Sequence, residues 1–292
     1  MEILLTGGSG FVGRNVIEQL SADYNFYTPK HAELDLTDTL AVQRYLAEHN
    51  FDLVIHAANL GGARNQTHVA HVLDINKRMF LNLAENSNLF GRMIFLGSGA
   101  EYGKQEPIVF VKESDFGSRY PADEYGQAKY FASEYIAAHD HFVNLRCLGI
   151  FGKYEDYDTR FISNAICRAL AGMSIVVRQN VRFDFLYVND LVRIIKTFID
   201  REPQHKFYNT GRGEPVELLR LAAIIKEKTG TQKNIVVKTE GWGKEYTCNN
   251  SLLLNEIASF KFTSYEQAIG EMVEYYRNNL LKIDKASLGF DE

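Results

Sequence analysis

The sequence has few cysteines and no long apolar run. Its three cysteines, Cys147, Cys167 and Cys248, stand far apart, with no C-x-x-C motif and no paired histidines nearby. We therefore expect no disulfide framework and no metal ion. No segment approaches the roughly 18 apolar residues of a membrane-spanning helix, and the acidic start at Glu2 is unlike a signal peptide. These absences predict a cytoplasmic protein that does not enter the membrane.

Basic residues do not gather anywhere along the chain. Lys and Arg number 32 against 37 Asp and Glu, which gives a net charge of −5. A nucleic-acid-binding surface needs concentrated positive charge, so no nucleic-acid partner is predicted. With 292 residues, of which 46% are hydrophobic and 24% charged, the chain is large enough for one main core and a smaller lobe.

The first twenty residues contain the clearest pattern. Residues 2–6 (EILLT) predict a buried strand, residues 7–13 (GGSGFVG) a glycine-rich turn, and residues 14–20 (RNVIEQL) a helix. Glycine allows a sharp turn from strand to helix and lets backbone N–H groups approach a pyrophosphate. Two registers fit: G-x-G-x-x-G from Gly8, or G-x-x-G-x-x-G from Gly7. The alternative is a glycine turn that binds nothing. The residues predicted to contact a dinucleotide are Gly7, Gly10, Phe11, Val12 and Gly13.

The next predicted strand covers residues 25–28 and ends at Pro29, where a dinucleotide fold contacts the adenosine ribose. Lys30 and His31 follow, without a carboxylate. A carboxylate at this place favours NAD because it accepts a hydrogen bond from the ribose 2′-hydroxyl, whereas Lys30 and His31 would attract a 2′-phosphate. We therefore predict NADP as the cofactor. NAD is the alternative, because a solvated loop lysine at position 30 is equally common.

Apolar strands alternate with amphipathic helices through the first half of the chain. Further strands are predicted at residues 51–56 (FDLVIH), 92–97 (RMIFLG) and 141–147 (HFVNLRC). This alternation predicts an α/β fold with a Rossmann-type, doubly wound parallel sheet. The backbone after the strand at 51–56 should pass close to the cofactor, because small residues follow it. These residues are Ala57, Ala58 and Asn59.

Three polar side chains are expected to meet at the end of one strand. Ser98 follows the strand at 92–97, and Tyr125 and Lys129 stand four residues apart on the next helix, so they share a face. The ammonium can favour the phenolate and lower the pKa of Tyr125 from its usual value of about 10. Because ligands bind at the carboxyl ends of parallel strands, we predict that these three residues are catalytic. Packing without chemistry is the alternative.

Other motifs accompany these along nearly the whole chain: Thr6 before the glycines, Asp35-Leu36, His56-Ala57-Ala58, Ser98 with Tyr102-Gly103, Tyr125-x-x-x-Lys129, Arg146, residues 183–190 (FDFLYVND) and residues 208–211 (YNTG). In this order they resemble the extended short-chain dehydrogenase/reductases, specifically the nucleotide-sugar epimerase/dehydratase/reductase family. Gly149 departs from the pattern, because the family usually has Asn three residues after the Arg.

The resemblance implies further cofactor contacts. Asp35 and Leu36 would lie against the adenine, and Asn76, on a helix predicted at about residues 69–88, occupies a position where the family keeps an Asn. It also implies a homodimer in which this helix and the helix of Tyr125 pack against their copies. An apolar stripe could be buried there, although core packing explains part of it. The stripe consists of Phe131, Tyr135 and Ile136.

The resemblance also implies a smaller lobe that holds the nucleotide diphosphate of a nucleotide-sugar substrate. On the amphipathic helix predicted at 161–171, Asn164 and Arg168 are the candidate substrate contacts together with Ser98, and a solvated arginine is the alternative. The predicted dinucleotide-binding domain comprises residues 1–150 and 181–211. The predicted substrate lobe comprises residues 151–180 and 212–292.

Residues after Ser98 discriminate among the chemistries of the family. Dehydratases carry an acidic pair where this chain has Gly99 and Ala100, and Glu101 lies one residue too far along. GDP-L-fucose synthases, which the chain resembles around residues 96–98 and 61–62, use a Cys at the place of Ala100 and a distant His where Arg160 falls. An acid and base for epimerisation beside the reduced carbon are therefore missing.

What remains is hydride transfer at a single carbon. We predict an NADPH-dependent reductase for the 4-keto group of a nucleotide-linked 4-keto-6-deoxyhexose. An NAD-dependent nucleotide-sugar 4-epimerase is the alternative, because it needs the same three catalytic residues. A non-catalytic NADP-sensing protein is a possibility of another class, disfavoured because such relatives usually lose the Tyr/Lys pair, which is intact here.

Overall fold

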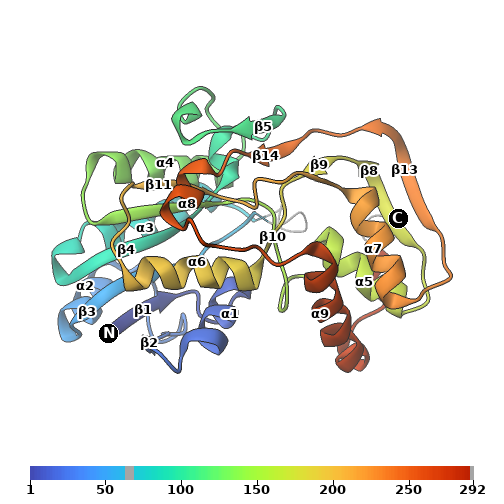
Figure 1. Cartoon of the computed structure of the whole chain (residues 1–292). Helices are drawn as coiled ribbons and strands as arrows, with labels where there is room; N and C mark the ends of the chain where they lie inside the picture. Colours follow the sequence, from blue (N-terminus) through green and yellow to red (C-terminus); the bar gives the residue numbers. More distant parts are fainter. Residues whose placement is uncertain (63–68, 290–292) are drawn as a thin grey trace.

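A computed structural model describes residues 1–62 and 69–289 of the chain (Figure 1). Its centre is a six-stranded sheet with the order β11-β6-β4-β3-β1-β2, in which every neighbouring pair is parallel. The strand order reverses beside β1, and ligands of such sheets bind at the carboxyl ends of the strands at this reversal. The strands are β1 (Glu2–Thr6), β2 (Asn25–Tyr27), β3 (Phe51–His56), β4 (Phe90–Ser98), β6 (Phe142–Cys147) and β11 (Phe207–Thr210).

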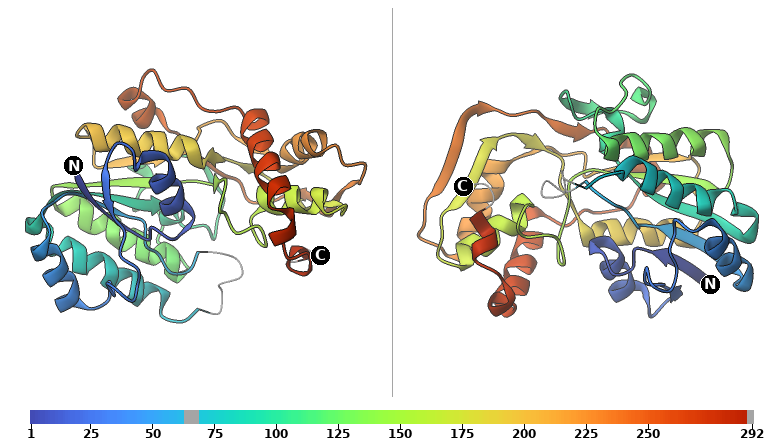
Figure 2. Two further views of the ribbon diagram at one scale, coloured as in Figure 1. Left: turned by 90° about the horizontal axis from the view of Figure 1, so that it is seen from below. Right: turned by 180° about the vertical axis from the view of Figure 1, so that it is seen from behind.

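Helices cover both faces of this sheet, as Figure 2 shows from two further sides. One face packs on α1 (Phe11–Leu20) and α6 (Val188–Asp200). The other face packs on α2 (Thr39–Glu48), α3 (Val72–Ala84) and α4 (Glu124–Ala138). The strands are apolar nearly throughout because both of their faces are buried. The predicted α/β fold with a doubly wound parallel sheet is confirmed.

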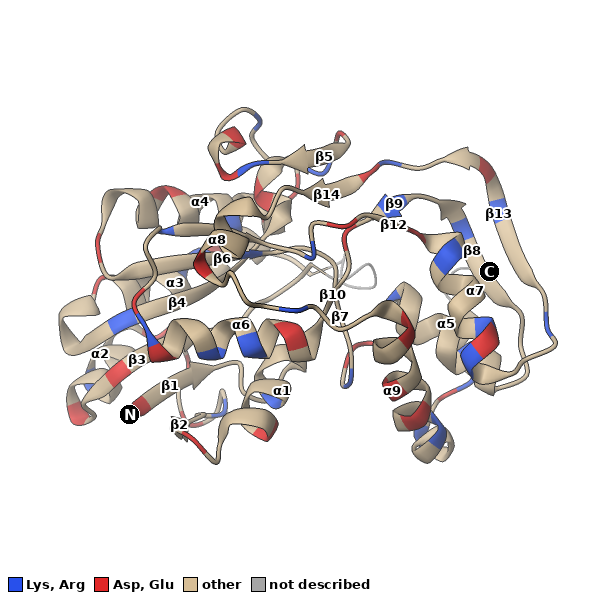
Figure 3. Cartoon of the chain, viewed as in Figure 1, with Lys and Arg blue, Asp and Glu red and all other residues tan. Residues whose placement is uncertain are grey.

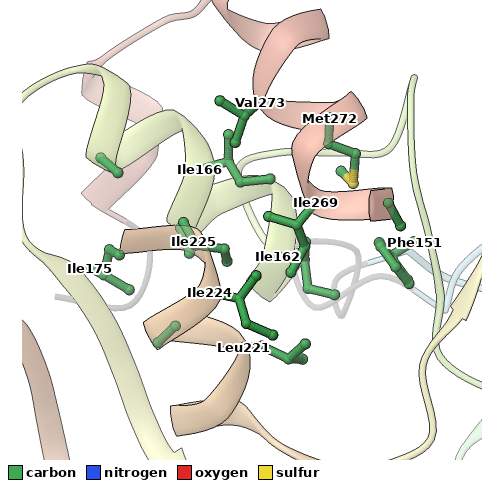
Figure 4. Packing of buried hydrophobic residues seen from close by; sticks show 14 of the residues in the cluster. Phe151, Ile162, Ile166, Ile175, Leu221, Ile224, Ile225, Ile269, Met272 and Val273 are labelled. Atoms are coloured by element: carbon green, nitrogen blue, oxygen red, sulfur yellow. The ribbon is translucent and has the colours of Figure 1, made fainter. Parts of the chain in front are cut away.

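A second lobe has its own apolar core, shown in Figure 4. Helices α5 (Phe161–Leu170), α7 (Leu218–Thr229) and α9 (Tyr265–Asn278) pack together beside the parallel pair β8 (Ile175–Asn180) and β13 (Ile235–Trp242). Aliphatic side chains from each helix fill this core and hold the lobe together without a disulfide. They include Ile162, Ile166, Leu221, Ile225, Ile269 and Met272.

Short strands connect the two lobes. A four-stranded sheet has the order β12-β9-β14-β5, and β7 (Ile150–Phe151) pairs with β10 (Leu186–Tyr187). The four strands are β5 (Ile108–Val111), β9 (Arg182–Phe183), β12 (Val216–Glu217) and β14 (Tyr246–Cys248). After β14 the chain forms α8 (Ser251–Glu256), and Leu253 packs into the main-sheet core. The C-terminal part of the chain thus serves both lobes, and the domain boundaries given above stay a prediction.

The helix expected at residues 69–88 is shorter in the structure. It begins at Val72 because His71 has a left-handed backbone with φ of 59°, and after Ala84 the chain tightens into a 3-10 turn at residues 87–89. Part of the expected dimer stripe is also unavailable for a partner. Ile136 is fully buried in the chain's own core, whereas Phe131 and Tyr135 are partly exposed.

Charged residues of both signs are interspersed over the helices of both lobes (Figure 3). Within residues 1–62 and 69–289, no helix combines the length and apolar character needed to cross a membrane. The three cysteines are unpaired, and only Cys147 is partly exposed.

Candidate active site

The glycine turn between β1 and α1 is packed too tightly for side chains. Gly7 has a positive φ of 72°, and a Cβ there would lie 2.7 Å from the backbone nitrogen of Ala58. A Cβ on Gly13 would lie 2.3 Å from the carbonyl oxygen of Gly7, to which the backbone N–H of Gly10 donates at 3.0 Å. Gly7, Gly10 and Gly13 therefore close one turn, as the register that starts at Gly7 requires.

The start of α1 fits a bound phosphate group. Its N-cap residue is Gly10, so no side chain caps the helix, and the first turn contains no acidic residue. Phe11 and Val12 are partly exposed there. The N–H groups at a helix start, together with the helix dipole, attract an anion such as a pyrophosphate. The residues that are present therefore suit the dinucleotide that the sequence predicts.

Hydrogen bonds fix the chain that leaves β3 beside this turn. The hydroxyl of Thr6 pairs with Nδ1 of His56 at 2.7 Å and accepts from the backbone N–H of Ala58 at 3.2 Å. Burial lowers the pKa of His56 to about 3, so the ring is neutral. The Asn76 amide exchanges two hydrogen bonds of 2.8 Å with the backbone of Leu60. Asn76 thus holds the β3–α3 connection in place, and a direct cofactor contact by it stays a prediction.

The segment after β2 exposes Lys30 and His31, as a phosphate-binding tip requires. A carboxylate also lies nearby, because the backbone N–H of Lys30 donates to Glu33 at 2.7 Å. Asp35 accepts from the backbone and hydroxyl of Thr37 at 2.8 Å, and these hydrogen bonds lower its pKa. One oxygen of the predicted adenine acceptor thus already has partners.

The remaining predicted cofactor contacts are Asn59, which follows β3, and Leu36, on the adenine side. Asn59 is exposed, and its amide donates to the carbonyl oxygen of Gly61 at 2.9 Å. A Cβ on Gly62 would lie 2.9 Å from Cε2 of Tyr125, so this loop packs against the ring of that tyrosine. Leu36 is buried in the core on the α2–α4 face of the sheet.

Ser98, Tyr125 and Lys129 come together where β4 ends and α4 begins. The hydroxyl of Ser98 lies close enough to the phenol of Tyr125 to lower the pKa of that phenol. The ammonium of Lys129 is buried, lies 5.8 Å from the centre of the Tyr125 ring and donates to the carbonyl oxygen of Leu96 at 2.8 Å. The three residues that the sequence predicts to be catalytic therefore lie near one another, and their catalytic role stays a prediction.

The pKa of Tyr125 differs from the sequence expectation. Burial raises it above its usual value, and this outweighs the hydrogen bond from Ser98 and the positive charge of Arg160, which lower it. Burial also lowers the pKa of Lys129 to about 8, and its ammonium donates to a backbone carbonyl. At neutral pH the phenol therefore keeps its proton and can act as a donor.

Glu101 supports the strand end that carries Ser98. Its carboxylate is fully buried and accepts from the backbone N–H of Ser98 at 3.0 Å, from Nε of Arg146 at 2.7 Å and from the hydroxyl of Ser133 at 2.5 Å. Asn144 donates to it as well. Because both of its oxygens are used in this way, Glu101 is a structural residue and not a second proton donor.

The sequence reasoning missed two neighbours of Ser98. Cys147 is its register partner on β6, and burial raises the pKa of this thiol to about 12, so the thiol stays neutral. Tyr246, on β14, has its hydroxyl 2.4 Å from the point where a Cβ of Gly99 would stand. Strand pairing in the four-stranded sheet that connects the lobes brings Tyr246 there, and no local sequence pattern predicts such a contact.

The predicted substrate contacts on α5 are used within the chain. The Asn164 amide donates to the carbonyl oxygen of Tyr157 at 3.0 Å, and Arg168 donates to those of Ser174 at 2.7 Å and Leu288 at 2.8 Å. Both side chains are buried and anchor the C-terminal turn, so their contact with a substrate stays a prediction. Among the residues that the structure describes, no group of His, Cys, Asp or Glu is placed to hold a metal ion.

Comparisons with known proteins show which family the chain resembles. A GDP-L-colitose synthase of Yersinia pseudotuberculosis is 26% identical over 95% of this chain and 98% of that protein. A GDP-L-fucose synthetase of Naegleria fowleri bound to NADP has a similar structure, with a TM-score of 0.83 at 19% identity over 97% of this chain and 95% of that one.

A UDP-glucose 4-epimerase of Thermotoga maritima, solved with UDP-glucose, has a TM-score of 0.82 at 23% identity over 96% of this chain and all of that one. These two structural similarities concern the fold. The model of the NAD dependent epimerase/dehydratase family matches residues 3–211, which include the glycine turn, Ser98, Tyr125 and Lys129. The chain therefore belongs to the NAD dependent epimerase/dehydratase family.

Proposed function

We propose that the protein reduces the 4-keto group of a nucleotide-linked 4-keto-6-deoxyhexose with NADPH. The observation that carries this proposal is the placement of Ser98, at the end of β4, near Tyr125 and Lys129 on α4, together with burial that raises the pKa of the Tyr125 phenol. A reduction needs a proton donor at the carbonyl oxygen, and a protonated phenol is one. The acidic side chain nearest to Ser98 in sequence, Glu101, is held by Arg146, so it supplies no further acid or base.

The chain's own residues suggest a division of labour. The nicotinamide supplies a hydride to the carbonyl carbon when it is bound. Ser98 donates a hydrogen bond to the carbonyl oxygen, and Tyr125 delivers the proton to the same oxygen. Lys129 would hold the ribose hydroxyls of the cofactor. Its ammonium lies near both the Leu96 carbonyl and the Tyr125 ring, a position that suits contact with a cofactor beside the catalytic tyrosine.

The cofactor would lie along the carboxyl ends of β1 and β3. The N–H groups at the start of α1 would hold the pyrophosphate. Lys30 and His31 would receive the 2′-phosphate, while Asp35 and Leu36 would lie against the adenine. The names of a synthase and an NADP-bound synthetase among the similar proteins support a reductive, NADP-dependent reaction.

A nucleotide-sugar 4-epimerase that retains NAD is the second candidate. The similarity to a UDP-glucose 4-epimerase and the Glu33 carboxylate beside Lys30 favour it. A protein that only senses NADP is the third candidate, and the placement of Ser98, Tyr125 and Lys129 near one another disfavours it.

We also propose a homodimer through α3 and α4, where Phe131 is partly exposed under the Lys77 ammonium at 4.2 Å. Light scattering at micromolar concentration tests this.

A panel of nucleotide 4-keto-6-deoxy sugars, assayed for NADPH oxidation, tests the main proposal. Turnover of one member with NADPH preferred over NADH is expected. Co-purified NAD together with interconversion of 4-epimers, and no net oxidation of NADPH, would select the epimerase. Tight NADPH binding without turnover of any ketosugar or 4-epimer would select the sensing protein.

A further inference from the structure

A second lysine lies beside the proposed proton donor. Lys104 follows Gly103, whose left-handed backbone, with φ of 78°, ends the 3-10 turn η3 (Gly99–Tyr102). The Lys104 ammonium lies 5.4 Å from the centre of the Tyr125 ring, and the Lys129 ammonium lies 5.8 Å from the same point. Two cations from different segments therefore lie over one phenol ring, and the proposed function uses only Lys129.

Lys104 is joined to the helix that carries this phenol. Its ammonium lies 3.7 Å from Oδ2 of Asp123, which is the N-cap residue of α4. The side-chain amide of the next residue, Gln105, donates to the carbonyl oxygen of Tyr120 at 2.8 Å, just before the same helix. These two contacts connect the loop after η3 to the start of α4, and they keep the ammonium near the ring.

The two lysines differ in their exposure to water. Lys129 is buried and donates to the carbonyl oxygen of Leu96 at 2.8 Å, whereas 39% of the Lys104 side chain is exposed. Salt can therefore screen the Lys104 charge, and it screens the Lys129 charge much less. Other titratable groups that act on Tyr125 come from η3, β6, the start of α5 and β14. They are Glu101, Cys147, Arg160 and Tyr246.

A cation over the ring matters most after proton transfer. In the proposed reduction the O–H bond of Tyr125 breaks and its proton passes to the carbonyl oxygen, while the hydride of the nicotinamide goes to the carbonyl carbon. Tyr125 then carries a negative charge until water returns a proton. A tyrosine ring attracts a cation over its face, and the attraction is stronger when the phenol is ionised, because the negative charge spreads over the ring.

We propose that Lys104 is a positioning residue that acts through Tyr125, because its ammonium stabilises the negative charge left on Tyr125 when the proton has passed to the substrate. This inference rests on the proposed function for the proton transfer, whereas the arrangement of the two lysines around the ring does not depend on it. A charge that is in place before the phenolate forms needs no reorganisation in the transition state, so it lowers the barrier.

Kinetics of Lys104→Met test the role, because this variant keeps the length of the side chain and removes the charge. We expect kcat to fall about fivefold, while KM for the nucleotide sugar and the affinity for NADPH stay within about twofold. Lys104→Arg keeps the charge and should stay near the unmodified rate. The matched control is Lys196→Met, on α6, whose ammonium lies 4.7 Å from the centre of the Tyr24 ring with 38% of the side chain exposed. It should leave kcat unchanged.

The pH and salt dependence of kcat separate this role from a structural one. Loss of a nearby cation raises the pKa of a phenol, so the limb of the pH profile in which Tyr125 loses its proton should lie at higher pH in Lys104→Met. Added salt should narrow the difference in kcat between this variant and the unmodified protein. Equal kcat values at low salt would overturn the role in proton transfer. A raised KM at unchanged kcat would also overturn it and would indicate direct contact between Lys104 and the substrate.

Nuclear magnetic resonance of the unliganded protein, with tyrosine labelled at Cζ, tests the electrostatic contact without any substrate. The Tyr125 signal is assigned from its loss in Tyr125→Phe, and it reports ionisation as the pH is raised. Ionisation should need a higher pH in Lys104→Met than in Lys104→Arg or Lys196→Met. Equal titration of Tyr125 in all three variants would overturn the contact. If no panel sugar is turned over, the proposed function fails, and the resonance measurement still decides whether Lys104 acts on Tyr125.

Discussion

Each lobe of the molecule buries a glutamate, and the two carboxyl groups have different surroundings. In the sheet lobe, Glu101 accepts from Arg146, Ser133, Asn144 and the backbone of Ser98. In the second lobe, Glu155 accepts from the hydroxyl of Ser163 at 2.6 Å, and no salt bridge includes it within the described residues. The first carboxyl is paired with a cation, and the second is not.

The pKa values reflect this difference. Burial raises the pKa of Glu155 to about 7, against the hydrogen bond from Ser163 and the charge of Arg160, which lower it. Arg146, beside Glu101, has a pKa that is raised although burial lowers it, because the carboxylate and the phenol of Tyr102 stabilise its charge. A site that must hold Ser98 in one place is thus built on paired charges, whereas the lobe beside it contains a group that titrates near neutral pH.

The largest effect is expected from breaking the pair of Glu101 and Arg146 in the sheet lobe. Glu101→Gln keeps the size of the side chain and leaves the buried Arg146 charge uncompensated. We expect a loss of about 3–5 kcal/mol in the free energy of unfolding, measured by urea denaturation at pH 7. Glu155→Gln is the matched variant in the second lobe and should not destabilise the protein at this pH. Equal losses in the two variants would show that pairing does not distinguish the lobes.

A smaller effect, on catalysis, is expected at the end of β4, which the Glu101–Arg146 pair supports. Tyr125→Phe removes the proton donor and keeps the ring, so kcat for a confirmed substrate should fall by roughly 10²-fold or more with NADPH affinity little changed. Tyr187→Phe, in which a hydroxyl that donates to Glu271 at 2.8 Å is removed, is the control outside the site. Turnover of Tyr125→Phe near the unmodified rate would mean that another group delivers the proton.

The sheet lobe was largely predictable from the sequence, and the physical reason is that its pattern is local. The glycines that admit no Cβ, the apolar strands and the i, i+4 pair of Tyr125 and Lys129 all lie within short segments. Contacts made across the lobes were not predictable in this way. Tyr246 reaches Gly99 only through the strand order of a four-stranded sheet. The direction of the Tyr125 pKa shift depends on burial, which sequence spacing does not reveal.

The buried Glu155 carboxyl of the second lobe should make the free energy of unfolding depend on pH. Its folded pKa of about 7 lies above the ordinary value of 4.5, so the folded state binds more protons between these limits. The stabilisation is complete below about pH 4.5 and is lost as the pH rises through 7. Between pH 5 and pH 8, Glu155→Gln should therefore gain about 2 kcal/mol relative to the unmodified chain. The exposed Glu266→Gln is the control, and parallel stability curves for Glu155→Gln and the unmodified chain would contradict this.

The smallest effect, on the choice of cofactor, is expected from replacing two exposed basic residues. Lys30 and His31 are exposed, so water and salt weaken their attraction for a 2′-phosphate. Replacing both by Ala should reduce the preference for NADPH over NADH by about tenfold at low salt, with little change in NADH affinity. Titration of both cofactors at two ionic strengths measures this, and the reduction should shrink as salt is added. Because Glu33 lies beside Lys30, Glu33→Gln should act in the opposite direction and strengthen NADPH binding. Equal affinities for the two cofactors in the unmodified protein would remove the basis for NADP and favour the epimerase.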